Sequence, residues 1–284
     1  MTQSPDLAIT GVTGRLGGGV ARRLTALSIP FRMIARDPSR APRLPGADVA
    51  RAAYGDREAA TATLRGVRTL FMVSAVEAPD RLTDHRAFVD AAADAGVRHI
   101  VYVSFLSAAA DSTFTLGRDH WWTERHIRAS GLDFTFLRDN LYADFLPTMV
   151  GDDGVLRGPA GDGRVAAVAE DDVADAAAAV LRDPAAHAGA AYGLTGPAAL
   201  ALAEVAGTIA RVIGRPTTYD AETVEEAYAS RAVYGAPRWQ VDAWVSTYIG
   251  IARGEFASVT GAIRHLTGHE PLSFEDVLTR SART

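Results

Sequence analysis

A glycine pattern near the N-terminus places the strongest constraint on how this chain folds. The stretch AITGVTGRLGGGV, residues 8–20, spaces Gly11, Gly14 and Gly17 three residues apart, directly after an apolar segment and at the start of a helical pattern. The first glycine allows a tight turn, the second lets the backbone approach a pyrophosphate, and the third lets helix and strand pack closely. A helix N-terminus also attracts anions. This context predicts dinucleotide binding rather than a merely tight turn.

The first half of the chain alternates strand-like and helix-like segments. Such alternation is typical of βαβ units, whose right-handed crossovers build a parallel sheet covered by helices on both faces. The sequence therefore predicts an α/β fold with a doubly wound, Rossmann-type sheet. The predicted strands are 7–10, 31–36, 47–52, 68–75, 98–105 and 132–138, and the predicted helices are 15–27, 57–66, 81–96 and 116–131.

The pattern loosens after residue 139. We predict a short helix over 141–150, a helix over 171–184 and a late strand over 191–196. The remainder reads as helices over 200–214, 222–231, 240–254, 258–268 and 273–280, the last capped by Ser273 and Asp276. We therefore expect an NAD(P)-binding domain over 1–150, to which elements from about 165–196 return, and a smaller, mostly helical substrate lobe over 197–284.

Composition excludes several classes of protein. The 284 residues carry a net charge of -5 without a dense basic run, which argues against a nucleic-acid partner. No apolar stretch is long enough to span a membrane, and the first residues do not resemble a secretory signal. The chain has no cysteine, which excludes disulfides and thiolate metal sites and fits a cytoplasmic location. The histidines show no metal-ligand spacing, so we expect no metal.

The end of the second predicted strand distinguishes NADP(H) from NAD. NAD enzymes usually place an acidic residue there to bind the ribose 2′-hydroxyl, whereas arginine can grip a 2′-phosphate. The strand ends at Arg36, and Asp37 begins a DPSR turn that it is expected to cap. We predict NADP(H), with Arg40 as a second cation. The alternatives are NAD binding through Asp37 and a merely solvated Arg36.

Asp56 lies where a carboxylate could accept a hydrogen bond from the adenine amino group, and it could equally cap the helix that follows. The other residues expected to contact the cofactor are Thr13, Arg15 and Leu16 in the glycine loop, Ser74 and Ser104 near the ends of two strands, and His120, discussed below.

Several motifs together resemble the NmrA-like group of atypical short-chain dehydrogenases/reductases, and within it the type 2 NAD(P)H:quinone oxidoreductases. They are the glycine pattern, Arg36, YGD at 54–56, VYVSFLSA at 101–108, HWWTE at 120–124 and SGLDFTFLRDNLY at 130–142. The resemblance implies a Rossmann fold and NAD(P) binding. It leaves the substrate open, because the group also contains regulators that bind NADP without turning it over.

The resemblance also locates a catalytic helix. Members that keep the catalytic pair carry Tyr-x-x-x-Lys followed four residues later by Glu. Aligning Glu124 with that glutamate places His120 in the lysine position and Leu116 in the tyrosine position. We predict that His120 binds the nicotinamide ribose and that Glu124 orients it; the alternative is an ordinary helical i, i+4 pair.

The missing tyrosine disfavours alcohol–ketone chemistry, which needs a proton on the carbonyl oxygen as hydride arrives. A quinone delocalises its new charge, and water can protonate the product later. Aromatic walls near the carboxyl edge of the sheet would suit a flat acceptor, although core packing is the alternative for each residue. The predicted substrate contacts are Phe105, Leu106, Trp121, Asn140, Tyr142 and Phe145.

These observations favour an NADPH-dependent reductase of a quinone or another conjugated small molecule. Two alternatives stay open. One is a non-catalytic NADP-binding sensor, and the other is a biosynthetic ketone or imine reductase in which His120 is the acid. A homodimer is compatible with the sequence.

Overall fold

The computed structural model describes residues 5–282, which divide into two compact units. Unit 1 comprises the chain up to Ser104 with Asp119–Arg138 and Val173–Tyr192. Unit 2 comprises Phe105–Arg118, Asp139–Asp172 and the chain from Gly193 onward. Neither unit is one continuous segment, so residues 105–118 and 139–150 group with the C-terminal part. The functional division into a cofactor domain and a substrate lobe stays a prediction.

Unit 1 is built on a seven-stranded sheet in the order β3-β2-β1-β4-β5-β6-β9. Strand β1 pairs in parallel with β2 and β4, β2 with β3, and β4 with β5. The order reverses between β1 and β4, which makes the carboxyl ends of these strands the switch point where such sheets bind ligands. The strands are β1 (Leu7–Ile9), β2 (Phe31–Ala35), β3 (Ala47–Arg51), β4 (Thr69–Met72), β5 (His99–Phe105), β6 (Asp133–Asp139) and β9 (Ala191–Gly193).

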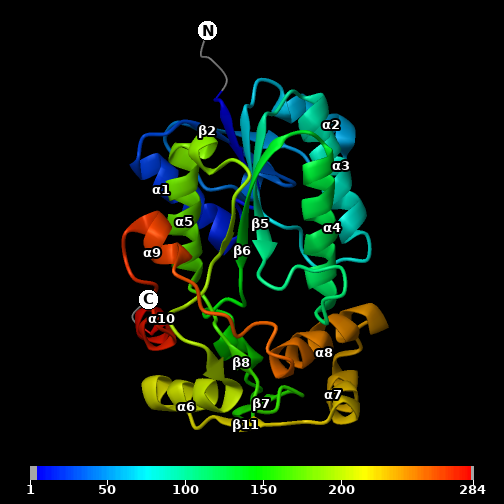
Figure 1. Ribbon diagram of the computed structural model, residues 1–284, viewed down its shortest axis with the longest axis vertical. Helices are drawn as coiled ribbons and strands as arrows, with labels where there is room; N and C mark the ends of the chain where they lie inside the picture. Colours follow the sequence, from blue (N-terminus) through cyan, green and yellow to red (C-terminus); the bar gives the residue numbers. More distant parts are fainter. Residues whose placement is uncertain (1–4, 283–284) are drawn as a thin grey trace. The chain divides into compact units, whose positions relative to one another are not determined.

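Helices cover both faces of this sheet (Figure 1). On one face lie α1 (Arg15–Ala26) and α5 (Glu170–Arg182), joined by an Arg23–Asp175 ion pair of 2.6 Å. On the other face lie α2 (Arg57–Leu64), α3 (Arg81–Asp94) and α4 (Thr115–Ala129). Fully buried side chains between that face and these helices include Leu64, Phe88 and Tyr102. The predicted doubly wound α/β fold is confirmed.

Unit 2 combines two small sheets with helices around its own core. Strand β7 (Val155–Arg157) pairs in parallel with β11 (Thr218–Asp220), and β8 (Arg164–Val165) pairs antiparallel with β10 (Leu200–Ala201). The core includes Leu156, Leu202 and Phe256. The helices are α6 (Leu202–Ile213), α7 (Val224–Arg231), α8 (Arg238–Ala252), α9 (Ala262–Thr267) and α10 (Phe274–Ser281), and Ser273 and Asp276 form the predicted capping box of α10.

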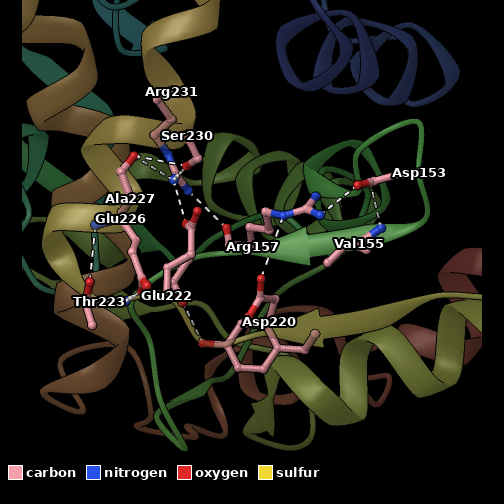
Figure 2. Close-up of polar contacts among 12 residues, drawn as sticks. Asp153, Val155, Arg157, Asp220, Glu222, Thr223, Glu226, Ala227, Ser230 and Arg231 are labelled. Carbon is pink, nitrogen blue, oxygen red and sulfur yellow. Dashed lines mark hydrogen bonds and ion pairs between the residues drawn. The ribbon is translucent and has the colours of Figure 1, made fainter.

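A buried ion pair fastens α7 to the first of these small sheets (Figure 2). The Nη1 atom of Arg231 lies 2.8 Å from a carboxylate oxygen of Glu222, and both side chains are nearly inaccessible. Nη2 of Arg231 donates to the carbonyl oxygen of Arg157 in β7, at 3.0 Å. Arg157 in turn pairs with Asp153 at 2.7 Å. Removing either member of a buried ion pair leaves the other charge buried without a partner, which is strongly destabilising. The pair therefore keeps Arg231 in the position from which it binds β7.

Two differences from the sequence-based prediction have local causes. The helix expected over 141–150 is wrong: only a 3₁₀ turn, η2 (Leu146–Met149), forms there. Residues 141–143 are extended instead, because Leu141 accepts from the amide of Val168 and Ala143 donates to its carbonyl. The four strands of unit 2 were not predicted, since segments of two or three residues show no alternation to detect.

Three further 3₁₀ turns lie between these elements, namely η1 (Pro38–Arg40), η3 (Pro184–His187) and η4 (Ala232–Tyr234). Across residues 5–282, no helix combines the length and the apolar character needed to cross a membrane.

Candidate functional site

The glycine loop joins β1 to α1 at the switch point, and each of its glycines has a distinct geometry. Gly11 has φ +69°, a conformation that side chains disfavour. A Cβ on Gly17 would lie 2.4 Å from the carbonyl carbon of Gly11, so the close approach of helix and strand requires glycine there. A Cβ on Gly14 would meet only the Gly11 oxygen, at 3.4 Å. The backbone geometry therefore requires glycine at positions 11 and 17. It does not require glycine at position 14, so another constraint, such as a ligand, must explain Gly14.

The start of α1 is open. Gly14 is the N-cap residue, and within the described part of the chain no side chain caps the helix. The amides of Arg15, Leu16 and Gly17 thus lack helical acceptors. Gly11, Thr13, Gly14 and Arg15 are exposed. Amides at an accessible helix N-terminus favour anions, so this geometry fits the predicted pyrophosphate site, and binding of a cofactor there stays a prediction.

The two candidate residues for cofactor choice differ in what they contact. The Asp37 carboxylate accepts hydrogen bonds from the Ser39 amide at 3.0 Å and the Ser39 hydroxyl at 2.7 Å. Both bonds hold the pKa of the Asp37 carboxyl below its usual value, and the bond from the Ser39 hydroxyl has the larger effect. Arg36 is exposed and, among residues 5–282, has no hydrogen-bond or ion-pair partner. The predicted capping role of Asp37 is confirmed: its Oδ1 atom accepts both bonds, while the Arg36 guanidinium is available.

Side chains fix the segment after β4, which faces the glycine loop across the switch point. The Tyr54 hydroxyl donates to the carbonyl of Val73, and the amide of Val73 donates to the Thr10 hydroxyl at 2.9 Å. The amide of Ala75 donates to Nε2 of His85 at 2.8 Å. Ser74, between these anchors, is half-buried. Asp56 accepts from the amide of Ala59 at 3.0 Å, which confirms its expected helix cap.

His120 lies within a buried hydrogen-bond chain of unit 1. Its Nε2 atom is 3.0 Å from Nη2 of Arg81, and its Nδ1 atom is 3.0 Å from the Tyr102 hydroxyl. Burial first, then the positive charge of Arg81 and the proximity of His85, lowers the pKa of His120 well below 6.5. The imidazole is therefore neutral at physiological pH, and both of its nitrogens are engaged.

Glu124 belongs to a separate buried group on α4. Its carboxylate accepts from the Ser104 hydroxyl at 2.6 Å and from two nitrogens of Arg138 at 2.8 and 2.6 Å. Arg128 lies 3.3 Å away. Such bidentate pairing stabilises a carboxylate and orients β6 against α4. The geometry supports a structural role for Glu124 and Ser104. The predicted orientation of His120 by Glu124 and the predicted contact of Ser104 with the cofactor stay predictions.

The predicted substrate residues fall in both units. Trp121, in unit 1, is half-buried. In unit 2, Phe105 packs edge-on against Phe256 with a ring separation of 5.1 Å, and it is buried. Leu106 is half-buried and Phe145 is 53 % exposed. Phe105 thus has the core environment that was its alternative interpretation.

Asn140 and Tyr142 are likewise held by their own unit. The Asn140 amide nitrogen donates to the carbonyls of Ala166 and Phe256, at 3.1 and 2.9 Å, and its oxygen accepts from the amide of Leu141. Tyr142 donates to Asp139. Burial first, then the Asp139 charge, raises the pKa of Tyr142 well above its ordinary value. Tyr142 is therefore a weaker acid than an ordinary tyrosine, and the side-chain amide of Asn140 is not an acid.

Sequence reasoning missed Arg81, His85, Tyr54 and Tyr102, although they build the polar interior of unit 1. Arg81 and His85 are four residues apart on α3, the spacing of one helix face, and that signal was available. Tyr102 lies between valines in β5, so the sequence indicated an apolar position and gave no sign that its hydroxyl is used.

An open glycine loop at the switch point of a doubly wound sheet defines a dinucleotide-binding α/β protein. The model of the NmrA-like family matches residues 3–237, and the chain belongs to that family. It is 33 % identical over 270 residues to quinone oxidoreductase 2 of Escherichia coli, covering 93 % of this chain and 94 % of that one. It is 31 % identical over 275 residues to an NAD(P)H azoreductase of Xenophilus azovorans, covering 95 % and 96 %.

The fold is also that of a solved relative. The crystal structure of the NADPH-dependent quinone oxidoreductase QOR2 of E. coli, complexed with NADPH, superimposes with a TM-score of 0.88 at 31 % identity. The match covers 97 % of this chain and 99 % of that one.

Proposed function

We propose that the protein is an NADPH-dependent oxidoreductase that transfers hydride to quinones or other conjugated aromatic acceptors. Relatives similar over nearly the whole chain include a quinone oxidoreductase and an azoreductase. Both names denote acceptors whose reduction places charge on a delocalised system. The E. coli relative was crystallised with NADPH.

The observation that carries this proposal is the lack of a usable proton donor on the predicted catalytic face of α4. Leu116 is aliphatic, and His120 is neutral with both nitrogens engaged. A general acid normally contributes about 10²–10⁴-fold to such a reaction. A ketone needs that contribution, whereas a reduced quinone can take its proton from water after hydride arrives.

The residues of unit 1 fit a bound NADPH. The helix N-terminus of α1 would hold the pyrophosphate, and Arg36 would hold the 2′-phosphate. NADPH supplies the two electrons and one hydrogen of the reduction as hydride. The protein then holds the cofactor and the acceptor in position for the transfer. We assign cofactor binding to unit 1 and most of the acceptor contacts to unit 2.

Replacing Arg36 by alanine should weaken NADPH binding selectively. The lost charge-assisted hydrogen bonds correspond to about 1.5–3 kcal/mol, or about 10- to 150-fold in dissociation constant. NADH has no 2′-phosphate, so its affinity should hardly change. Calorimetric titration with both cofactors tests this, and Arg86→Ala, which removes an exposed arginine from α3, is the control. Equal weakening of both cofactors by Arg36→Ala would refute the assignment.

A panel of acceptors tests the function itself. NADPH oxidation should be rapid with benzoquinones or naphthoquinones, measurable with azo dyes, and negligible with unconjugated ketones. Ketone turnover comparable to quinone turnover would favour the dedicated ketone reductase. Tight NADPH binding without turnover of any acceptor would favour the sensor.

The homodimer and the cytoplasmic location are further parts of the proposal. Sedimentation at micromolar protein concentration tests the first, and fractionation of the source cells tests the second.

A further inference from the structure

Arg81 is a charged residue in an interior position. It begins α3, and only 3 % of its surface is exposed. Its Nε atom donates to the carbonyl of Ala75 at 2.9 Å, and Nη1 donates to Asp119 at 3.2 Å. Nη2 reaches His120. One guanidinium therefore joins the segment after β4 to two consecutive residues of α4, and burying it requires these partners.

The contact between Arg81 and His120 settles the tautomer of the imidazole. A guanidinium donates only, so Nε2 of His120 must be the acceptor and carry no proton. In the neutral ring the proton is then on Nδ1, which donates to the Tyr102 oxygen. His85 follows the same logic, because its Nε2 accepts from the Ala75 amide and its Nδ1 faces Thr123 at 2.9 Å.

The charges around His120 oppose its protonation. Arg81 of α3 and Tyr102 of β5 contact His120, and His85 of α3 lies near enough to act on its charge. Asp119, on the same helix as His120, pairs with Arg81. The negative charge of Glu124 is balanced by ion pairs with Arg138 and Arg128. A proton on Nε2 would place a second positive charge against the guanidinium and break their hydrogen bond.

We propose that Arg81 is a positioning residue for the reduction: it holds His120 as the neutral Nδ1–H tautomer and fixes the Ala75 backbone at the cofactor edge of unit 1. This inference rests on the proposed function for its link to turnover. Arg81 thereby prevents His120 from acting as an acid, so the reaction is confined to acceptors that water can protonate.

The first test observes the imidazole directly and needs no turnover. Nitrogen-15 NMR of histidine-labelled protein should show His120 as Nδ1–H, uncharged at about pH 6 and above. In Arg81→Met, Nε2 loses its donor, so the Nε2–H tautomer should appear and the ring should begin to titrate. Arg125→Met removes an exposed arginine from α4 and should leave the His120 signals unchanged. A wild-type Nε2–H tautomer, or unchanged signals in Arg81→Met, would overturn the proposal.

The second test uses quinone reduction. Wild-type kcat/KM should be flat from about pH 6 to 8, whereas Arg81→Met should lose about 10-fold or more and gain a histidine-like limb. Arg81→Lys keeps a donor and a charge and should retain the flat profile at reduced rate. If Arg81→Met does not fold, the wild-type NMR spectrum and the pH profile of Arg81→Lys decide whether Arg81 holds the tautomer of His120. A correct tautomer without any turnover would refute the proposed function and leave the imidazole assignment standing, and a histidine-like limb in the wild type would refute the role of Arg81.

Discussion

Replacing Gly14 by valine is expected to abolish dinucleotide binding while the protein stays folded. Gly14 has φ −96° and ψ 176°, which valine adopts readily, and its Cβ would meet the Gly11 oxygen only at an ordinary 3.4 Å. The branched side chain would project over the amides of Arg15 and Leu16, which the pyrophosphate must approach. Losing two charge-assisted hydrogen bonds corresponds to about 3–6 kcal/mol, so NADPH and NADH should both weaken at least about 100-fold.

Gly17→Ala is the matched comparison because it should fail for the opposite reason. Its Cβ would lie 2.4 Å from the Gly11 carbonyl and 2.7 Å from that of Thr10, so α1 must move away from β1. We expect a loss of at least about 3 kcal/mol, which lowers the melting temperature by roughly 6–12 °C. Calorimetry gives both quantities. A folded Gly14→Val protein that still binds NADPH as tightly as wild type would remove the glycine loop from the cofactor site.

The fold of unit 1 was predictable because its elements carry strong local signals. β-branched and aromatic residues mark β5, Gly96 adopts the left-handed conformation just beyond α3, and Asp56 caps α2 as predicted. Unit 2 was harder. Its strands are too short to show a period. Residues 141–143 pair with Val168, a contact between distant positions that local sequence does not indicate.

The candidate site divides in the same way. The geometry of the glycine loop and the cap made by Asp37 were predictable because each depends on residues close in sequence, and the role of Arg36 stays a prediction. The environment of His120 was not, since its partners Arg81 and Tyr102 come from other elements. Glu124 is a second example. Helical spacing suggested that it orients His120, whereas its carboxylate binds Ser104 of β5 and Arg138 of β6.

The buried histidines have a consequence for stability that can be measured without any ligand. Burial is the largest cause that lowers the pKa of both His85 and His120 well below 6.5, and Arg81 is the second. An unfolded chain restores an ordinary histidine pKa of about 6.5. Below that pH the unfolded state therefore binds more protons than the native state, and the free energy of unfolding falls as the pH falls. Above about pH 6.5 these histidines are largely uncharged in both states, so their full contribution to the free energy of unfolding is present.

We expect stability to decrease by about 1.4 kcal/mol per pH unit for each of these histidines, or about 2.7 kcal/mol per unit for both, as the pH falls below about 6. His99, whose pKa burial also lowers, adds in the same direction. Denaturant unfolding between about pH 7.5 and 5 measures the slope, in a window above the titration of ordinary carboxylates. His120→Gln should reduce the slope by about 1.4 kcal/mol per pH unit, the amount that corresponds to one proton, and should lower stability near neutral pH.

Leu64→Ala is the control, because it removes a fully buried apolar side chain of α2 and no titratable group. It should cost about 2–5 kcal/mol at every pH and leave the slope unchanged. A wild-type protein whose stability is constant across this window would show that His85 and His120 take up protons in the native state over the same pH range as in the unfolded chain. The donor that Arg81 supplies to Nε2 of His120 would then have to be absent in solution, because a protonated imidazole has no lone pair to accept it.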